Sequence, residues 1–218
     1  MKIKYYGHAA FKLTSDTGVR IIVDPYQSGA FDGALSYGKI TDEADIVLTS
    51  HDHDDHNYTG DLKGTFAHIG KAGTHSVKGV KVRGLPTHHD GSGGKERGNN
   101  LLFVIEVDGM IVAHVGDLGH TLDKDLLEEI GRIDVLLIPV GGFFTIDARQ
   151  ATTVMNDLKP ALTIPMHFKT EKSGFPIAKV EEFISDKNGV RMAKSSEVEI
   201  KKETLPRTAE IVVLDYAL

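Results

Sequence analysis

The 218-residue chain contains no cysteine, which excludes disulfide bonds, thiolate metal ligands and a cysteine nucleophile. No apolar run approaches the ~20 residues that a membrane-spanning helix needs. The segment Met1–Tyr6 already has a strand-like pattern and lacks the apolar region of a signal peptide. We therefore expect a cytoplasmic protein that does not cross a membrane.

Positive charge is also in short supply. The 25 Lys and Arg residues against 31 Asp and Glu residues give a formal net charge of −6. This balance argues against a nucleic-acid partner, because such binding relies on a basic surface. The length suffices for a substantial core. Since no linker-like composition divides the chain, we expect one domain over residues 1–218. A homo-oligomer is compatible with the sequence, although no apolar stripe requires one.

Many short strands with few helices between them are expected. Helices are expected over residues 122–130, ended by Gly131, over residues 151–158, preceded by the capping-box pair Asp147 and Gln150, and over residues 180–184. A glycine-rich segment, residues 90–98, is interpreted as a lid or substrate loop in preference to a surface linker. The expected strands cover residues 3–6, 11–14, 20–23, 46–49, 80–85, 101–107, 110–115, 135–140, 162–166, 197–201 and 210–214.

The segment His51-Asp52-His53-Asp54-Asp55-His56 is the most informative in the chain. It supplies neutral nitrogen and anionic oxygen donors, which borderline divalent metals such as zinc prefer. The same atoms could also hold manganese, iron or nickel. The segment has more donors than one metal with an open position needs. We therefore predict two divalent metal ions that share a site.

Further donors follow other expected strands. Asp117 follows strand 110–115, His167 follows strand 162–166, and His88 and His89 follow strand 80–85. His8 and Asp24 likewise follow the strands 3–6 and 20–23. Ligands collect at the carboxyl ends of strands in layered α/β proteins, so these side chains are expected to converge on one edge.

The spacing of the donors indicates how two metals would be shared. Residues i and i+2 of an extended segment point the same way, so His51 and His53 can hold one metal, completed by His89. Asp55 and His56 can face a second metal, completed by His167. Asp117 can bridge the two through its carboxylate oxygens. Each metal would then keep an open position, as in catalytic sites.

In this order and spacing, the pattern His51-x-His53-x-Asp55-His56, a later His after a strand, Gly116-Asp117 and His167 resembles the metallo-β-lactamase superfamily. The resemblance implies an αββα sandwich, in which two mixed sheets lie face to face with helices outside and the dimetal site lies at one edge. The match extends over most of the chain. It implies an enzyme, a metal-dependent hydrolase.

Within the superfamily, the chain is most similar to a compact branch of metal-dependent hydrolases that includes the ascorbate-6-phosphate lactonases. The matching segments are Gly7–Phe11, Asp24-Pro25, Gly116–Gly119, Ile138–Gly142 with Thr145, and Ile164–His167. His53 stands where the electron-transferring diiron branch carries Glu, which favours hydrolysis over redox chemistry. The third histidine is either His88 or His89. We choose His89, because a His-Asp pair followed by a glycine-rich segment and Arg97-Gly98-x-Asn100 resembles this branch, and His88 remains the alternative.

The expected reaction is attack by a hydroxide shared by two metals on a carbonyl or phosphoryl centre of an ester, lactone or phosphorylated small molecule. Asp55 is expected to be the catalytic residue that orients the hydroxide. Arg97 and Lys169 could receive a phosphate or carboxylate. The alternatives are a phosphodiesterase or ribonuclease of the same superfamily and a non-catalytic metal-binding protein. Further candidates for substrate contact or for support of the ligands are His8, Asp24, His120 and Thr145.

Overall fold

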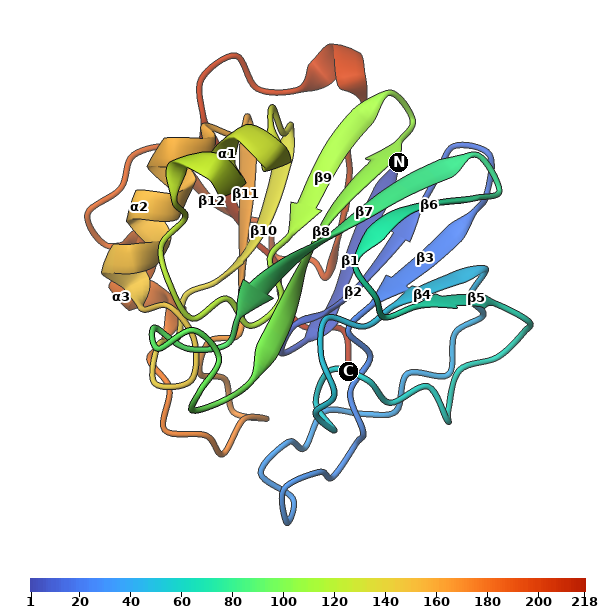
Figure 1. Cartoon of the computed structure of the whole chain (residues 1–218), viewed down its shortest axis with the longest axis horizontal. Helices are drawn as coiled ribbons and strands as arrows, with labels where there is room; N and C mark the ends of the chain where they lie inside the picture. Colours follow the sequence, from blue (N-terminus) through green and yellow to red (C-terminus); the bar gives the residue numbers. More distant parts are fainter.

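The computed structural model describes residues 1–218 as two mixed β-sheets packed face to face (Figure 1). The smaller sheet has six strands in the order β13-β1-β2-β3-β4-β5. The bounds of these strands are β1 Lys2–Gly7, β2 Ala10–Thr14, β3 Arg20–Val23, β4 Ile46–Leu48, β5 Ala67–Ile69 and β13 Glu197–Glu199.

The larger sheet has eight strands in the order β12-β14-β11-β10-β9-β8-β7-β6. The strands from β12 to β9 pair in parallel, and those from β9 to β6 pair antiparallel. The bounds are β6 Gly73–Val77, β7 Val80–His88, β8 Asn99–Val107, β9 Met110–His114, β10 Val135–Pro139, β11 Leu162–Met166, β12 Val190–Met192 and β14 Glu210–Val213.

The three helices lie beside the larger sheet. Helix α1 (Lys124–Ile130) begins at the Asp123 cap and ends at Gly131, and helix α2 (Ala148–Leu158) carries the expected capping box. Helix α2 contacts strand β10 and helix α3 (Val180–Ile184). Figure 1 shows all three on the outer side of this sheet, away from β1 to β3. A 3-10 turn, η1 (Lys202–Thr204), precedes β14.

Strands β3 and β4 of the smaller sheet are buried on both faces. Ile21 and Val23 of β3 point into the main core between the sheets, whereas Ile22 points outward into a second apolar cluster. The cover on that outer face is the segment 26–44, which contributes Tyr26 and Tyr37, with the chain end at residues 216–218 beside it. Burial on both faces explains why β3 and β4 read as continuous apolar runs.

The sandwich of two mixed sheets is as expected, with two differences. The outer layer over the smaller sheet contains no helix, because segment 26–44 is rich in glycine and serine and covers the sheet with turns. Strands β5, β6 and β12 were not predicted, because each is a short strand at or near a sheet edge with few buried side chains to mark it. None of the helices is long and apolar enough to span a membrane.

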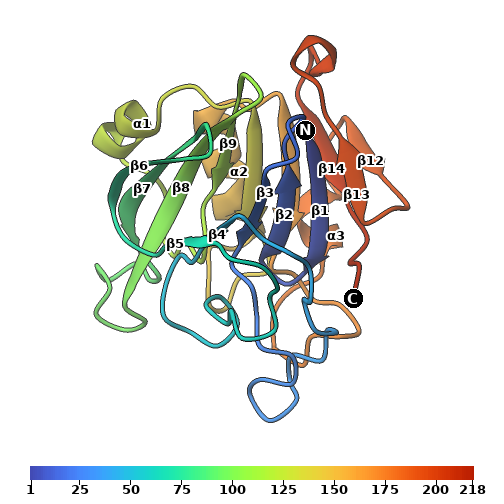
Figure 2. The ribbon, with the colours of Figure 1, turned by 90° about the vertical axis from the view of Figure 1, so that its right-hand side faces the viewer.

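The strands that precede the predicted donors run in the same direction within each sheet. In the smaller sheet β1, β3 and β4 are parallel to one another, and in the larger sheet β7, β9 and β11 are. Figure 2 shows β1, β2 and β3 lying in front of the larger sheet. The carboxyl ends of both sets reach one end of the sandwich, because the residues that follow β1 and β11 are hydrogen-bonded to each other. The chain connections after these strands therefore meet there.

Several of these connections begin with an unusual backbone conformation. His8, Asp24 and His167 have positive φ angles of 55°, 47° and 50°. A positive φ is uncommon for residues other than glycine and is often found where a functional side chain must be aimed. In each case the conformation turns the chain directly after the strand ends.

The burial of both faces of β3 generates a stability prediction. Ile22→Ala should lower the free energy of unfolding by about 2–5 kcal/mol, as Ile21→Ala should, because both side chains are completely buried in apolar surroundings. Met192→Ala is the matched control, since this side chain is exposed. Denaturant unfolding followed by circular dichroism measures all three. A loss in Ile22→Ala no larger than in the control would show that segment 26–44 does not cover the sheet.

Candidate metal centre

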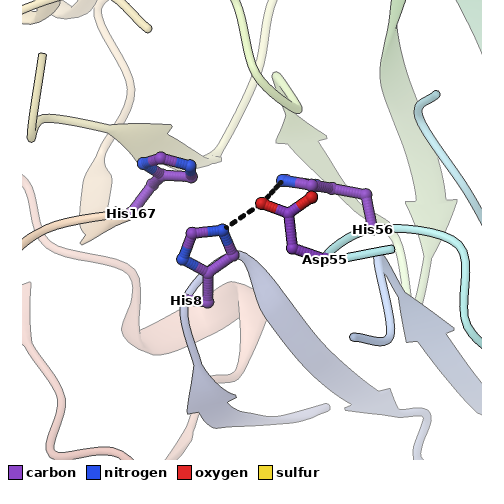
Figure 3. Close-up of side chains that lie close together, drawn as sticks. All are labelled: His8, Asp55, His56 and His167. Carbon is purple, nitrogen blue, oxygen red and sulfur yellow. Dashed lines mark hydrogen bonds and ion pairs between the residues drawn. The ribbon is translucent and has the colours of Figure 1, made fainter. Parts of the chain in front are cut away.

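The predicted donors converge at the shared end of the two sheets. The ligand atoms of His51, His53 and His89 all lie within 4.8 Å of one another. A second group with the same spread of ligand atoms joins Asp55, His56 and His167 to His8. Figure 3 shows the side chains of this second group pointing toward one another from three separate segments of the chain.

Asp117 lies between the two groups. Its Oδ1 is 3.2 Å from Nε2 of His56, and its Oδ2 is 3.1 Å from Nε2 of His89 and 3.4 Å from Nε2 of His167. One carboxylate therefore faces members of both groups. This is the placement that the sequence predicted for a bridging ligand.

The hydrogen bonds of the imidazoles fix which nitrogen each presents to the centre. Asp24 accepts from Nδ1 of His56 at 2.9 Å, and the backbone carbonyl of Phe144 accepts from Nδ1 of His89 at 3.1 Å. Ser50 donates its hydroxyl proton to Asp24 and must therefore accept from Nδ1 of His51. In all three rings Nε2 is therefore the nitrogen that faces the centre, as in metal-ligating histidines whose other nitrogen is held by an outer partner.

The buried atoms without a hydrogen-bond partner include three that face the centre: Nε2 of His51, Nε2 of His56 and Oδ1 of Asp117. Buried polar atoms are normally satisfied. Two imidazole lone pairs and a carboxylate oxygen are all acceptors, so they cannot satisfy one another without a cation or a proton. This donor set fits a divalent metal ion.

The pKa shifts at the site also indicate that positive charge is required there. Burial opposes charge throughout the site, yet the carboxylates of Asp117 and Asp55 raise the pKa of His56 well above its ordinary value. Burial also acts to raise the pKa of Asp117, but His167 and His56 hold it well below the usual range. The carboxylates thus draw positive charge to the centre, and a divalent cation supplies that charge.

Asp24 supports one histidine of each group. Its Oδ2 accepts from His56 directly and reaches His51 through the Ser50 hydroxyl, while its Oδ1 accepts from the Ser50 backbone N–H at 2.7 Å. Burial by itself would raise the pKa of this carboxyl, but the hydrogen bond and charge of His56 lower it. Asp24 is therefore ionised, and its hydrogen bonds orient one histidine of each donor group.

His8 holds the predicted catalytic carboxylate. Its Nε2 lies 2.9 Å from Oδ2 of Asp55 (Figure 3). Burial lowers the pKa of His8 to about 4, so the ring is neutral near pH 7 and donates to Asp55. The sequence placed His8 among the residues that bind substrate or support ligands. The side chain of His8 is completely buried and contacts Asp55. This placement agrees with the second of these roles, the support of a ligand.

A cavity of about 340 Å³ opens onto the donors and is lined by Phe31, His53, Asp55, His89, Glu96, Arg97, Asp117, Phe144, His167 and Phe175. Of the expected substrate contacts, only Arg97 lines it. His120 accepts from the backbone N–H of His88, Thr145 donates to the Ile146 carbonyl, and Asp24 is fully buried. None of these three side chains lines the cavity, so their expected contact with substrate stays a prediction, and Asp24 has the other expected role, support of the ligands.

The choice between His88 and His89 also has a structural answer. His89 faces Asp117, whereas the ring of His88 lies beside that of His120 at a centroid distance of 5.8 Å. His88 belongs to neither donor group.

The three phenylalanines of the cavity were not identified from the sequence. Their position in loops around the donor-bearing strands was the available signal.

Comparisons with known proteins agree with this geometry. A family model described as the β-lactamase superfamily domain matches residues 2–167. A metal-dependent hydrolase from Thermococcus onnurineus is 34% identical and covers 91% of this chain and 98% of its own length. One from Carboxydothermus hydrogenoformans is 33% identical over 78% of this chain and 85% of its own.

The solved structures include a similar fold from Thermotoga maritima, described as a candidate Zn-dependent hydrolase of the metallo-β-lactamase superfamily. It matches with a TM-score of 0.82 at 34% identity, and the alignment covers 98% of this chain and 97% of that one. The expected fold class, an α/β metallo-β-lactamase fold, is thereby confirmed.

The Asp24 arrangement predicts a graded loss of metal affinity. Asp24→Asn should weaken binding at both donor groups by about 10- to 100-fold, because the amide lacks the charge and has one accepting atom, whereas Asp24 uses Oδ2 for the Ser50 hydroxyl and His56 and Oδ1 for the Ser50 N–H. Ser50→Ala should weaken only the group that contains His51. Competition with a chromophoric chelator measures both affinities.

Thr49→Val is the control, since this neighbouring hydroxyl contacts His68 and not the donors. Circular dichroism establishes that each variant is folded. Wild-type affinity for two ions in folded Asp24→Asn would contradict the supporting role of Asp24.

Proposed function

The chain belongs to the metallo-β-lactamase superfamily and is a metal-dependent hydrolase, and from this premise we propose that it uses two divalent metal ions to cleave an ester, lactone or phosphorylated small molecule. The observation that carries the proposal is the convergence of two donor groups on the shared carboxylate of Asp117. A site for a single ion needs fewer donors than these two groups contain.

We assign the first ion to His51, His53 and His89 and the second to Asp55, His56 and His167, with Asp117 between them. Zinc is the first candidate, because imidazole and carboxylate donors suit it and because the Thermotoga maritima relative is described as Zn-dependent. When bound, the ions would supply Lewis acidity that activates water and polarises the bond to be cleaved.

Two residues of the protein have roles in the proposed reaction: His8 positions the carboxylate of Asp55, and Asp55 accepts the proton of the attacking water. Asp55 lines the cavity. Its Oδ2, which accepts from His8 and lies 3.6 Å from Nε2 of His56, would also serve the second ion, and Oδ1 is left to accept a proton from an attacking water. Burial opposes its ionisation, but the charge of His56 and the hydrogen bond from His8 hold the pKa of Asp55 below its usual range. The carboxylate is therefore ionised at neutral pH, as a proton acceptor must be.

The size of the cavity supports a small substrate. Its volume of about 340 Å³ lies near the lower end of the range for small-molecule sites. The net charge of −6 argues against a polynucleotide substrate, because binding of one relies on positive charge. We therefore propose a small-molecule substrate.

Metal analysis is the first test. Protein purified without added metal should contain about two divalent ions per chain, and Asp117→Ala should contain fewer because the shared carboxylate is lost. Asp54→Ala is the matched control, since this exposed carboxylate of the same segment belongs to neither donor group. Elemental analysis by mass spectrometry gives the stoichiometry. No metal above background after reconstitution would refute the proposal.

Turnover is the second test. Asp55→Asn should lower kcat by about 10²- to 10⁴-fold, because the amide cannot accept a proton. Aryl ester, lactone and phosphodiester substrates are assayed in parallel with the metal content of each variant. Asp54→Asn should retain wild-type kcat. A folded, metal-loaded Asp55→Asn with an unchanged rate would refute the role of Asp55, and two bound ions without hydrolysis of any substrate would favour a non-catalytic protein.

A further inference from the structure

One wall of the cavity is made of aromatic rings. Phe175 packs edge-to-face against Phe31 and against Phe144, with centroid distances of 5.4 and 5.6 Å. Such pairs contribute beyond the area that they bury, so the three rings form a connected surface. Phe31 is 48% exposed and has a φ of 55°. A phenylalanine in a left-handed conformation is uncommon, and at this position the half-exposed ring lines the cavity.

Arg97 is the only Lys or Arg side chain that lines this cavity. Its guanidinium lies over the ring of Phe144 at 5.9 Å, and the nearest carboxylate is that of Glu96 at 4.0 Å. That distance is too long for a hydrogen bond, and the Glu96 carboxylate accepts from the Ser92 hydroxyl at 2.6 Å. The donors of Arg97 are therefore available to a ligand. Lys169, in contrast, donates to the Phe175 carbonyl at 2.7 Å.

The loop that carries Arg97 is built around one carboxylate. Asp90 accepts from the backbone N–H groups of Ser92, Gly94, Glu96 and Arg97 at 2.7–2.9 Å. These bonds hold the pKa of Asp90 below its usual range, and the bond from the Arg97 N–H has the largest effect. The segment 90–98 is thus a turn fixed around an anion and not a loose linker.

The same loop is tied to the donor groups. The Gly98 carbonyl accepts from the backbone N–H of His89 at 3.1 Å, and the Phe144 carbonyl accepts from the ring of His89. His89 therefore bonds directly to the backbone of Gly98, the residue after Arg97, and to the backbone of Phe144, whose ring lies beneath the guanidinium. The cation and the aromatic wall are held at a set position relative to the candidate metal centre.

We propose that the substrate carries an apolar body that packs against Phe31, Phe144 and Phe175 and an anionic group, carboxylate or phosphate, that binds Arg97. This inference rests on the proposed function of the site. A planar guanidinium with free donors, backed by an aromatic ring, is suited to both anions. Arg97 determines specificity and takes no part in the bond cleavage.

The test uses 4-nitrophenyl esters matched in length. 4-Nitrophenyl hexanoate is neutral, mono-4-nitrophenyl adipate ends in a carboxylate, and 4-nitrophenyl 5-phosphonopentanoate ends in a phosphonate. Arg97→Gln should raise KM for the anionic esters by about 10- to 100-fold and leave kcat and the neutral ester within twofold. Arg97→Lys should restore part of the loss. The ester with the greater change identifies the preferred anion.

Two further variants separate the parts of the proposal. Arg207→Gln, which removes an exposed cation outside the cavity, should change none of these constants. Phe31→Ala should raise KM for the neutral and anionic esters alike, because the apolar wall acts on both. Equal kcat/KM for neutral and anionic esters in the wild type and in Arg97→Gln would overturn the inference.

A binding measurement keeps this inference separate from the proposed function. Calorimetry of the metal-loaded protein should show tighter binding of 4-phenylbutyrate than of 4-phenylbutanol, and Arg97→Gln should abolish the difference. If no ester is cleaved but this difference is found, the reaction class is wrong and the anion site stands. If esters are cleaved and the two ligands bind equally, the anion site is wrong and the hydrolase stands.

Discussion

The buried carboxylate of Asp24 is the interaction on which the site depends most. It lies at the turn after β3, fully enclosed, and the hydrogen bonds that reach it come from Ser50 and His56. A buried charge without partners would be strongly unfavourable. The fold therefore has to bring the segment after β4 to this carboxylate, and in doing so it orients both donor groups.

The two sheets are joined at the same end by backbone contacts. The carbonyl of His8 accepts from the N–H of His167 at 2.7 Å, and the carbonyl of Ser50 accepts from the N–H of Leu101 at 2.9 Å. The first bond links the turns after β1 and β11, and the second links the turn after β4 to β8. Because these bonds involve residues beside the donors, the spacing between the donor groups is set by the backbone.

Sequence reasoning located the donors because it required only strand direction. His51, Asp117 and His167 each follow a buried strand, and the carboxyl ends of such strands converge. It could not assign His8 to a donor group, since that assignment depends on a turn at positive φ. It also could not settle His88 against His89 by alternation, because the buried positions of β7 shift by one residue at Gly84 and Leu85.

The loops were the least predictable part. Periodicity marks neither the bonds that collect around Asp90 nor the packing of Phe31 against Phe175, because both contacts join residues with no regular spacing. The non-helical cover over β3 was missed for the same reason. Local composition indicated turns in that segment, and only tertiary packing shows what they cover.

The order of the donors along the chain has a consequence for how the molecule is made. His51 to His56 lie within six residues, whereas His8 and His167 are separated by most of the sequence and meet only when both sheets have formed. A nascent chain could thus hold an ion weakly at the short segment long before β11 is synthesised. Full affinity belongs to the folded state alone, so the free energy of ion binding adds to the stability of the sandwich by mass action. Metal supply and folding yield are then coupled quantities.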